Sequence, residues 1–153
     1  MNQKPISIED IKNLREKTGA GVADCREALE DAEGKMDEAI KILRKKGEEK
    51  AEKKSEREVK AGAVFSYVHH TGRIGSMVAL ACETDFVAKT EDFQKLGREL
   101  AMHIAASRPE NMEELLGQEY VRDASRKIEE VIKEVIGKLG ENIQVADFKV
   151  VVI

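Results

Sequence analysis

Aromatic residues make up only 4% of the 153-residue sequence, and tryptophan is absent. A core with so few aromatic side chains must take its apolar burial mainly from aliphatic residues. Because 41% of the residues are hydrophobic and 37% are charged, the aliphatic residues are expected on amphipathic helices. The composition predicts a helix-rich soluble protein, long enough for one domain or for a small module joined to a compact second domain.

Long apolar segments are also missing. The longest unbroken apolar run, Met77–Cys82, is far shorter than the roughly 18 residues that a membrane-spanning helix needs. The start of the chain, Met1–Pro5, contains no apolar signal-peptide centre. The two cysteines, Cys25 and Cys82, lie too far apart to indicate a disulfide framework. We therefore expect a cytoplasmic protein that does not bind membranes.

The charges are balanced rather than of one sign. Lys and Arg number 26, and Asp and Glu number 30, which gives a net charge of −4. Nucleic-acid backbones are bound through a surplus of cations, so this balance disfavours a nucleic-acid partner. Within residues 48–60, ten of thirteen residues are charged, five acidic and five basic. Such a neutral run without aromatics is typical of a solvated helical linker, and we place the domain boundary there.

The N-terminal part of the sequence has the pattern of three short helices. Ser7 and Asp10 form a capping-box pattern, and a break at Thr18–Gly21 ends the first helix. The third helix is predicted to stop at Gly47. Each apolar stripe is too narrow to be stable alone, so we expect residues 1–47 to form a small three-helix bundle.

After the charged segment the apolar period changes to two, which indicates strands. Residues 61–68 and 74–83 are predicted to pair as an antiparallel hairpin around a glycine-containing turn. The second of these strands is apolar on both faces, so we expect it to be central. A helix that Pro109 ends, one short and one long helix, and a terminal strand over residues 143–153 complete an α+β core over residues 61–153.

The residue patterns of common active sites are absent. The glycine-containing segment Thr18–Gly21 lacks the Lys-Ser/Thr of a phosphate-binding loop and joins two helices rather than a strand and a helix. No zinc-ligand spacing occurs among the cysteines and histidines, which are Cys25, His69, His70, Cys82 and His103. No nucleophile elbow or Ser/His/Asp order is found. We expect no enzymatic activity, no metal or other cofactor, and no direct nucleotide binding.

One aromatic residue stands in an unusual place. Phe86 lies in a short polar loop beside Asp85, directly after the apolar second strand. Large aromatic side chains are usually buried, so composition alone favours a position under the hairpin. The alternative is an exposed wedge for a partner, because functional side chains concentrate on loops that a rigid scaffold holds.

Two segments resemble the signatures of the bacterial elongation factor Ts family. The first is Leu14–Leu29, with the sequence LREKTGAGVADCREAL, and the second is Cys82–Lys89, with the sequence CETDFVAK. Further similarity runs through Phe93–Leu96, Ala101–Ala105 and Gly140–Ile143. The resemblance therefore covers almost the whole chain in the expected order.

The resemblance implies an architecture and a function. The expected fold is a three-helix module similar to ubiquitin-associated (UBA) domains, a charged linker helix over residues 48–60, and a core with a three-stranded antiparallel sheet packed by helices. The expected function is that of a translation elongation factor and guanine-nucleotide exchange factor. Such a factor binds elongation factor Tu in its GDP form and promotes the release of GDP.

The same resemblance implies which residues contact elongation factor Tu. A core loop inserts between helices of its GTPase domain, near the magnesium and phosphate site, and contains Thr84, Asp85, Phe86 and Val87. The aromatic side chain acts there as a wedge that disturbs the site. The N-terminal module grips another part of the same domain through residues at or near Arg15, Gly19, Gly21, Val22, Ala23 and Arg26.

Two alternatives stay open at this point. Three-helix modules of this kind also recognise ubiquitin-like folds or nascent chains, so the second candidate function is a UBA-like protein-binding module without exchange activity. Short family members with a single core copy act as homodimers, and the apolar end Phe148–Ile153 would leave an edge strand that needs covering. The other interpretation of that strand is central pairing within one subunit.

Overall fold

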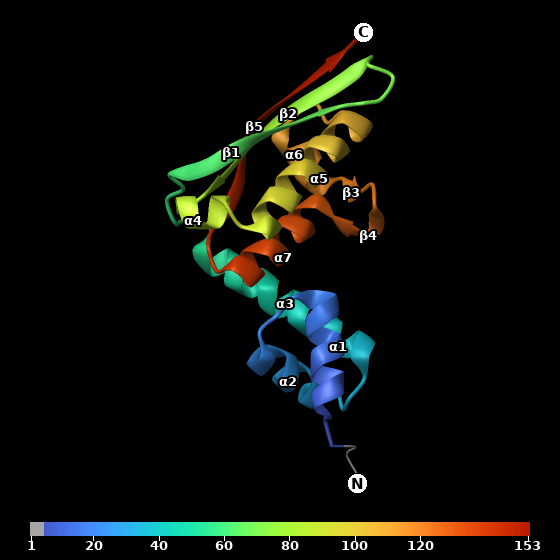
Figure 1. Cartoon of the computed structure of the whole chain (residues 1–153), viewed down its shortest axis with the longest axis vertical. Coiled ribbons are helices and arrows are strands. Elements are labelled where there is room, and N and C mark those ends of the chain that lie inside the picture. Colours follow the sequence, from blue (N-terminus) through green and yellow to red (C-terminus); the bar gives the residue numbers. More distant parts are fainter. Residues whose placement is uncertain (1–4) are drawn as a thin grey trace.

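Three helices form the N-terminal end of the molecule, and a sheet with its covering helices forms the other end (Figure 1). The structure is a computed structural model that describes residues 5–153. Residues 1–4, on which the expectation of a missing signal-peptide centre largely falls, lie outside the described residues. Over the described part the fold is α+β, with seven helices, a three-stranded antiparallel sheet and a two-stranded hairpin.

The N-terminal end consists of α1 (Ile8–Thr18), α2 (Val22–Asp31) and the first part of α3 (Met36–Lys54). The predicted capping box starts α1. The Asp10 N–H donates to the Ser7 Oγ at 3.0 Å, and the Ser7 N–H donates to the Asp10 carboxylate at 3.2 Å. The three helices close over a small, mostly aliphatic core made of Ile11, Leu14, Cys25, Ala28, Leu29, Ala32, Ala39 and Leu43.

Helix α3 runs through Gly47 and ends at Lys54, so the predicted stop at Gly47 is wrong. One interior glycine costs a helix only about 1 kcal/mol, which packing can offset. Here Ala51 is buried in a second core, whereas Leu43 is buried in the first. The charged segment 48–60 is therefore helical only in its first part, as a continuation of α3, and its remainder leads to the first strand.

The larger sheet contains β1 (Ala61–Val68), β2 (Ile74–Cys82) and β5 (Ile143–Val152), in the order β1-β2-β5 and antiparallel throughout. The central position of β2 confirms the prediction. Only one of its faces is buried, however, since Met77 on the other face is 54% exposed. Among the described residues β5 pairs with β2 alone and is an edge strand, so the interpretation of central pairing is wrong.

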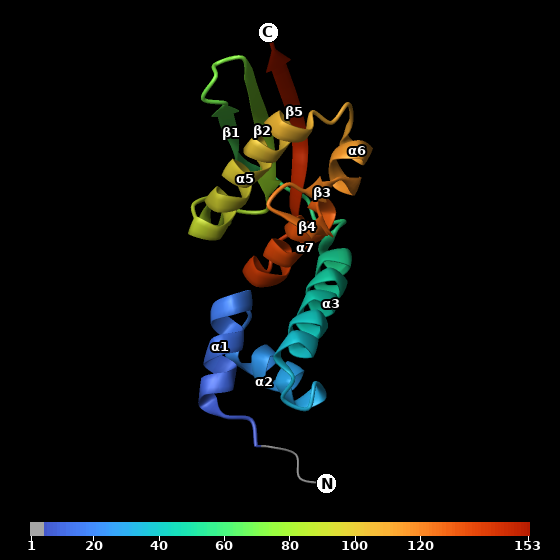
Figure 2. The same ribbon diagram turned by 90° about the vertical axis from the view of Figure 1, so that its right-hand side faces the viewer.

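Helix α5 (Glu91–Ser107) covers the buried face of the sheet, and α7 (Ile128–Leu139) packs against α3, α5 and β5 (Figure 2). Thr90 caps α5, and its Oγ1 accepts the Phe93 N–H at 3.3 Å. The helix ends before Pro109, as the sequence predicted. Between helices and sheet lies the larger core, which includes Phe65, Val78, Leu80, Phe93, Leu100, Ile104, Ile128 and Ile143.

The segment between α5 and α7 contains more than the predicted short helix. That helix is α6 (Met112–Gly117), and a hairpin of β3 (Glu119–Tyr120) and β4 (Asp123–Lys127) follows it. Strand β3 has only two residues, and the five residues of β4, with the sequence DASRK, do not alternate between apolar and polar, so neither shows the pattern of a half-buried strand. The hairpin is therefore visible only in the folded structure.

Buried His103 on α5 holds this hairpin in place. Its Nδ1 accepts the Val121 N–H at 3.3 Å, so its Nε2 donates to the Gln118 amide oxygen, at 2.9 Å. Burial lowers the pKa of His103, which favours the neutral ring that can accept this hydrogen bond. His103 thus has a structural role between α5 and the hairpin.

Helices α3 and α7 cross closely at two glycines, Gly47 and Gly137. A Cβ atom on Gly137 would lie 2.9 Å from the Gly47 Cα, which is closer than real Cβ atoms approach. A Cβ atom on Gly47 would meet only the Lys133 carbonyl oxygen, at 3.9 Å. The crossing lets the helix that serves both cores lie directly against α7.

We expect Gly137→Ala to lower the free energy of unfolding by about 1–3 kcal/mol, because α3 and α7 must separate to make room for the methyl group. Gly47→Ala is the matched control. Alanine has space there and is the better helix former, so this change should be neutral or stabilising by up to about 1 kcal/mol. Urea unfolding of both variants tests the prediction, and equal effects would show that the crossing is not close-packed.

Candidate partner-binding site

The residues after β2 form a single helical turn, α4 (Asp85–Ala88), where the sequence predicted a loop. Thr84 caps this turn, because its Oγ1 accepts the Val87 N–H at 3.4 Å. Asp85 is exposed, and the Phe86 side chain is 86% exposed. The position under the hairpin that composition favours for Phe86 is therefore wrong, and the ring faces solvent.

The inner side of the same turn anchors it to the core. Val87 is only 9% exposed and packs in the larger core together with Ala88. The Thr90 Oγ1 donates to the Val87 carbonyl at 2.7 Å, and the Gln94 amide donates to the Ala88 carbonyl at 2.8 Å. Of the residues to which the resemblance points, Val87 thus supports the turn and Phe86 is presented to solvent.

The second set of predicted residues surrounds the start of α2. Five of its six members are exposed, namely Arg15, Gly21, Val22, Ala23 and Arg26. Val22, an apolar side chain, is 51% exposed. Gly19 differs, because it is half-buried and ends α1 with φ 68°. A Cβ atom on Gly19 would lie 2.4 Å from the Lys138 Nζ, so this glycine lies against α7.

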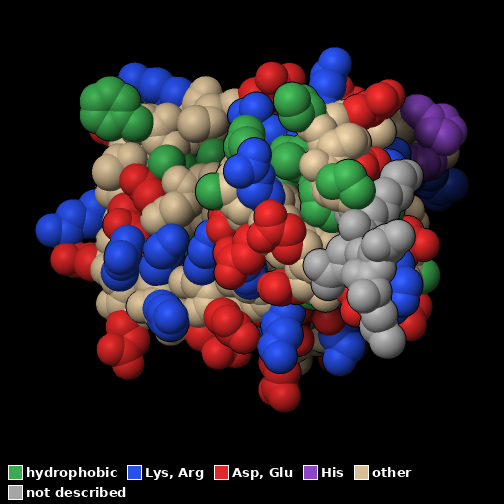
Figure 3. All heavy atoms as spheres, turned by 90° about the horizontal axis from the view of Figure 1, so that it is seen from below, with side chains coloured by type: hydrophobic (Ala, Val, Ile, Leu, Met, Phe, Trp, Pro, Cys, Tyr) green, Lys and Arg blue, Asp and Glu red, His purple; other side chains and the backbone are tan. Residues whose placement is uncertain are grey.

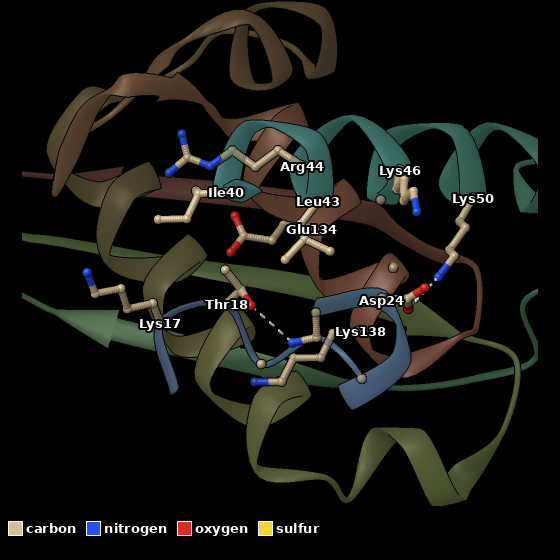
Figure 4. Close-up of a pocket in the computed structure, with 15 residues that line it drawn as sticks. Lys17, Thr18, Asp24, Ile40, Leu43, Arg44, Lys46, Lys50, Glu134 and Lys138 are labelled. Atoms are coloured by element: carbon tan, nitrogen blue, oxygen red, sulfur yellow. Dashed lines mark hydrogen bonds and ion pairs between the residues drawn. The ribbon is translucent and has the colours of Figure 1, made fainter. Parts of the chain in front are cut away.

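The two sets of residues are presented by one body. In Figure 1, α4 and α2 both lie toward the left-hand side, α4 on the sheet end and α2 on the helical end. The loop between α1 and α2 meets α3 and α7 along a groove of about 300 Å³ (Figure 4). One ion pair at this groove joins α3 to α2, since the Lys50 Nζ lies 3.1 Å from the Asp24 carboxylate. Nearby, the Lys138 Nζ lies 3.0 Å from the Asp92 carboxylate, which ties α7 to α5.

The surface at the N-terminal end has no strong charge of one sign. Lysine and arginine alternate there with aspartate and glutamate, and hydrophobic side chains lie among them (Figure 3). Such a surface does not create the single-sign field that steers highly charged ligands. Contacts at this end would therefore combine apolar side chains with individual ion pairs.

The described residues contain neither a membrane-spanning helix nor a cluster of metal ligands. Within residues 5–153, no helix has both the length and the apolar character needed to cross a membrane. Over the same residues, no three His, Cys, Asp or Glu side chains are grouped so that they could hold a metal ion.

An exposed aromatic side chain on an anchored turn, together with an exposed apolar helix start, is typical of proteins that act by binding another protein. Both features belong to a chain in which one helix takes part in two cores. The fold and site therefore define a two-core α+β protein of the protein-binding class.

Sequence similarity identifies the family. The family model described as Elongation factor TS matches residues 83–153, which contain the turn and β5. The elongation factor Ts of Fervidobacterium nodosum is 40% identical over 188 aligned positions, which cover 94% of this chain and 95% of that protein. That of Petrotoga mobilis gives the same values, and that of Thermotoga maritima is 39% identical over 186 positions, covering 94% of each chain. The chain belongs to the elongation factor Ts family and is a translation elongation factor.

The chain is shorter than these relatives. Its alignment with the Fervidobacterium nodosum protein spans 188 positions, which is 35 more than the 153 residues of this chain. That relative therefore has at least 35 residues without a counterpart here. The turn with Asp85 and Phe86 nevertheless lies inside the segment that matches the family model.

The two sides of the turn should respond differently to truncation. Phe86→Ala is expected to change the free energy of unfolding by less than about 0.5 kcal/mol, because the ring is exposed. Val87→Ala removes buried methyl groups and is expected to lower it by about 1–3 kcal/mol. Chemical denaturation measures both. A large loss with Phe86→Ala would mean that the ring supports the fold.

Proposed function

We propose that this chain is a guanine-nucleotide exchange factor for elongation factor Tu, and that the turn with Asp85 and Phe86 acts on the GTPase domain of that partner. The observation that carries the proposal is the Phe86 ring, which is 86% exposed although the other side of its turn is fixed in the core. A phenyl ring held in water gains free energy when a partner covers it. A rigid turn adds to this gain, because little conformational freedom is lost on binding.

In the proposed mechanism Phe86 acts as a wedge. GTPases hold the phosphates of their nucleotide through backbone amides and Mg²⁺. Phe86 inserts between helices of the GTPase domain near this site and displaces the groups that support the metal. GDP then dissociates, although the factor makes no direct contact with the nucleotide. No covalent bond is made or broken, so the factor needs no cofactor of its own and is not an enzyme.

Linkage explains why the factor is released again. If the bound factor weakens GDP binding by a given ratio, bound GDP must weaken the grip of the factor by the same ratio. The factor therefore speeds the approach to equilibrium and leaves the nucleotide equilibrium itself unchanged. When nucleotide and Mg²⁺ return to the GTPase, they expel the wedge.

The N-terminal helices are proposed to form a UBA-like module that grips a second part of the same GTPase domain. Exposed Val22 and Ala23 at the start of α2 supply an apolar contact. Two contacts on one partner raise the effective concentration of the second once the first has formed. We divide the chain into this module over residues 1–47, a linking segment over 48–60, and a core over 61–153 that carries the wedge.

Stopped-flow release of a fluorescent GDP analogue from elongation factor Tu tests the proposal. Wild-type protein should accelerate release. Phe86→Ala should lower the release rate at saturating factor by at least about tenfold, because a rise of about 1.4 kcal/mol in the activation free energy slows a reaction tenfold. The exposed residue Lys89 offers a control, because Lys89→Ala lies beside the same turn and keeps the ring. Binding without acceleration by the wild type would instead support the UBA-like binding module.

A second copy of this chain is proposed to cover the outer face of the sheet. Four apolar side chains on this face are more than half exposed, namely Val64, Val68, Met77 and Val151. Lys149 and Asp147 lie among them, with Nζ and carboxylate 3.9 Å apart. A two-fold axis between these two would place each lysine opposite the aspartate of the other copy, which makes the face self-complementary.

The free edge of β5 is a poorer interface than this face. The pairing with β2 is interrupted by a bulge at Ala146, between Val145 and Asp147. The Asp147 carboxylate also accepts the Phe148 N–H at 2.9 Å, which occupies a backbone donor of the strand. Bulges and charged side chains are features that protect edges against strand pairing.

Sedimentation velocity at micromolar concentration tests the homodimer. Wild-type protein should sediment as a dimer, and Met77→Asp should give a monomer, because it buries an unpaired charge in the interface. Val22→Asp serves as the control, since it alters an equally exposed apolar residue on the helical end and should leave the dimer intact. A wild-type protein that sediments as a monomer would contradict the prediction.

A further inference from the structure

Two carboxylates join the end of β2, where the α4 turn begins, to the segment that leads into β5. Glu141 lies between α7 and β5, and its Oε1 accepts the Thr84 N–H at 3.0 Å while its Oε2 accepts the Thr84 Oγ1–H at 2.7 Å. In the opposite direction, the Glu83 Oε1 accepts the Asn142 N–H at 2.8 Å. The segment after β2 and the segment before β5 are therefore joined in both directions. In each direction a glutamate side chain of one segment accepts a backbone N–H of the other.

Thr84 is the residue through which Glu141 reaches the turn. Its hydroxyl donates to Glu141 and at the same time accepts the Val87 N–H that starts α4. A helix of four residues cannot maintain itself, because nucleation is unfavourable and propagation adds too few bonds. The orientation of α4, and with it that of Phe86, therefore depends on contacts outside the turn.

The loop that carries Glu141 is itself fixed. Asn142 is 2% exposed, and its side-chain amide donates to the Arg57 carbonyl at 2.8 Å. Gly140 ends α7 in the left-handed conformation, with φ 78°, which sets the direction of the chain into this loop. Glu141 thus approaches Thr84 from a rigid position, 57 residues further along the chain.

We propose that Glu141 is a positioning residue for nucleotide exchange, which holds the Thr84 cap so that Phe86 points toward the GTPase. This inference rests on the proposed exchange function and deepens it. Without Glu141 the turn populates other orientations, and only the fraction with a correctly placed ring binds productively. The apparent affinity for elongation factor Tu is then the intrinsic affinity multiplied by that fraction. The rate of GDP release within the assembled complex is unchanged.

The test separates these two quantities in full-length protein. Release of fluorescent GDP from elongation factor Tu is measured against the concentration of factor. Glu141→Ala should raise the half-saturating concentration roughly tenfold, the value of a lost hydrogen bond to a charged group, and change the saturating rate by less than about twofold. Phe86→Ala should instead lower the saturating rate. Glu113→Ala, at an exposed glutamate on α6, should change neither.

A double substitution tests whether Glu141 acts through Thr84. Thr84→Val removes the hydroxyl and keeps the size of the side chain. If Glu141 acts through that hydroxyl, the combined variant should raise the half-saturating concentration by less than the product of the two single effects. Thr84→Ser retains the hydroxyl and should therefore keep the dependence on Glu141 that Thr84→Val removes. Full multiplication of the two effects would overturn the proposal.

Hydrogen exchange of the Val87 N–H in the free chain gives a readout that does not depend on the partner. Glu141→Ala should increase its exchange rate, and Glu141→Gln, which keeps one acceptor oxygen, should increase it less. An unchanged exchange rate, or an unchanged half-saturating concentration in a folded Glu141→Ala variant, would refute the positioning role. Failure of wild-type protein to accelerate GDP release would refute the exchange function itself, and with it the role of Glu141 in exchange.

Discussion

The close crossing of α3 and α7 at Gly47 and Gly137 is the contact on which the arrangement of the whole molecule depends. Helix α3 buries Leu43 in the N-terminal core and Ala51 in the larger core, so it connects the two cores without a flexible joint. The absence of side chains at the crossing lets it lie directly on α7. The distance between the start of α2 and the α4 turn is therefore set by helix packing.

A fixed distance would matter for the proposed binding of one partner at two places. Linked contacts strengthen each other only when the geometry allows both to form at once. Ion pairs near the groove tie α3 to α2 and α7 to α5, although exposed ion pairs each contribute little. The apolar crossing and the continuous helix carry the larger share.

The features predicted correctly from sequence are those with local causes. The capping box at Ser7 and the helix end before Pro109 each depend on a few neighbouring residues. The first two strands of the sheet were visible because their strand-type residues extend over eight or more positions on either side of a glycine-containing turn. The stop predicted at Gly47 failed because the cost of one glycine is small beside the packing of α3 on both cores. The β3–β4 hairpin has no alternating apolar pattern, and it depends on His103, which lies elsewhere in the chain.

The sequence by itself determined the family, the α+β class and the identity of the loop with Asp85 and Phe86, because those depend on residue order and composition. Tertiary structure alone decided that Phe86 faces solvent while Val87 is buried, since neighbouring side chains on a short turn point to different sides. It also brought Glu141 to Thr84 across 57 residues of chain. Contacts of this kind arise from the pairing of β2 with β5, and no local pattern in either segment encodes them.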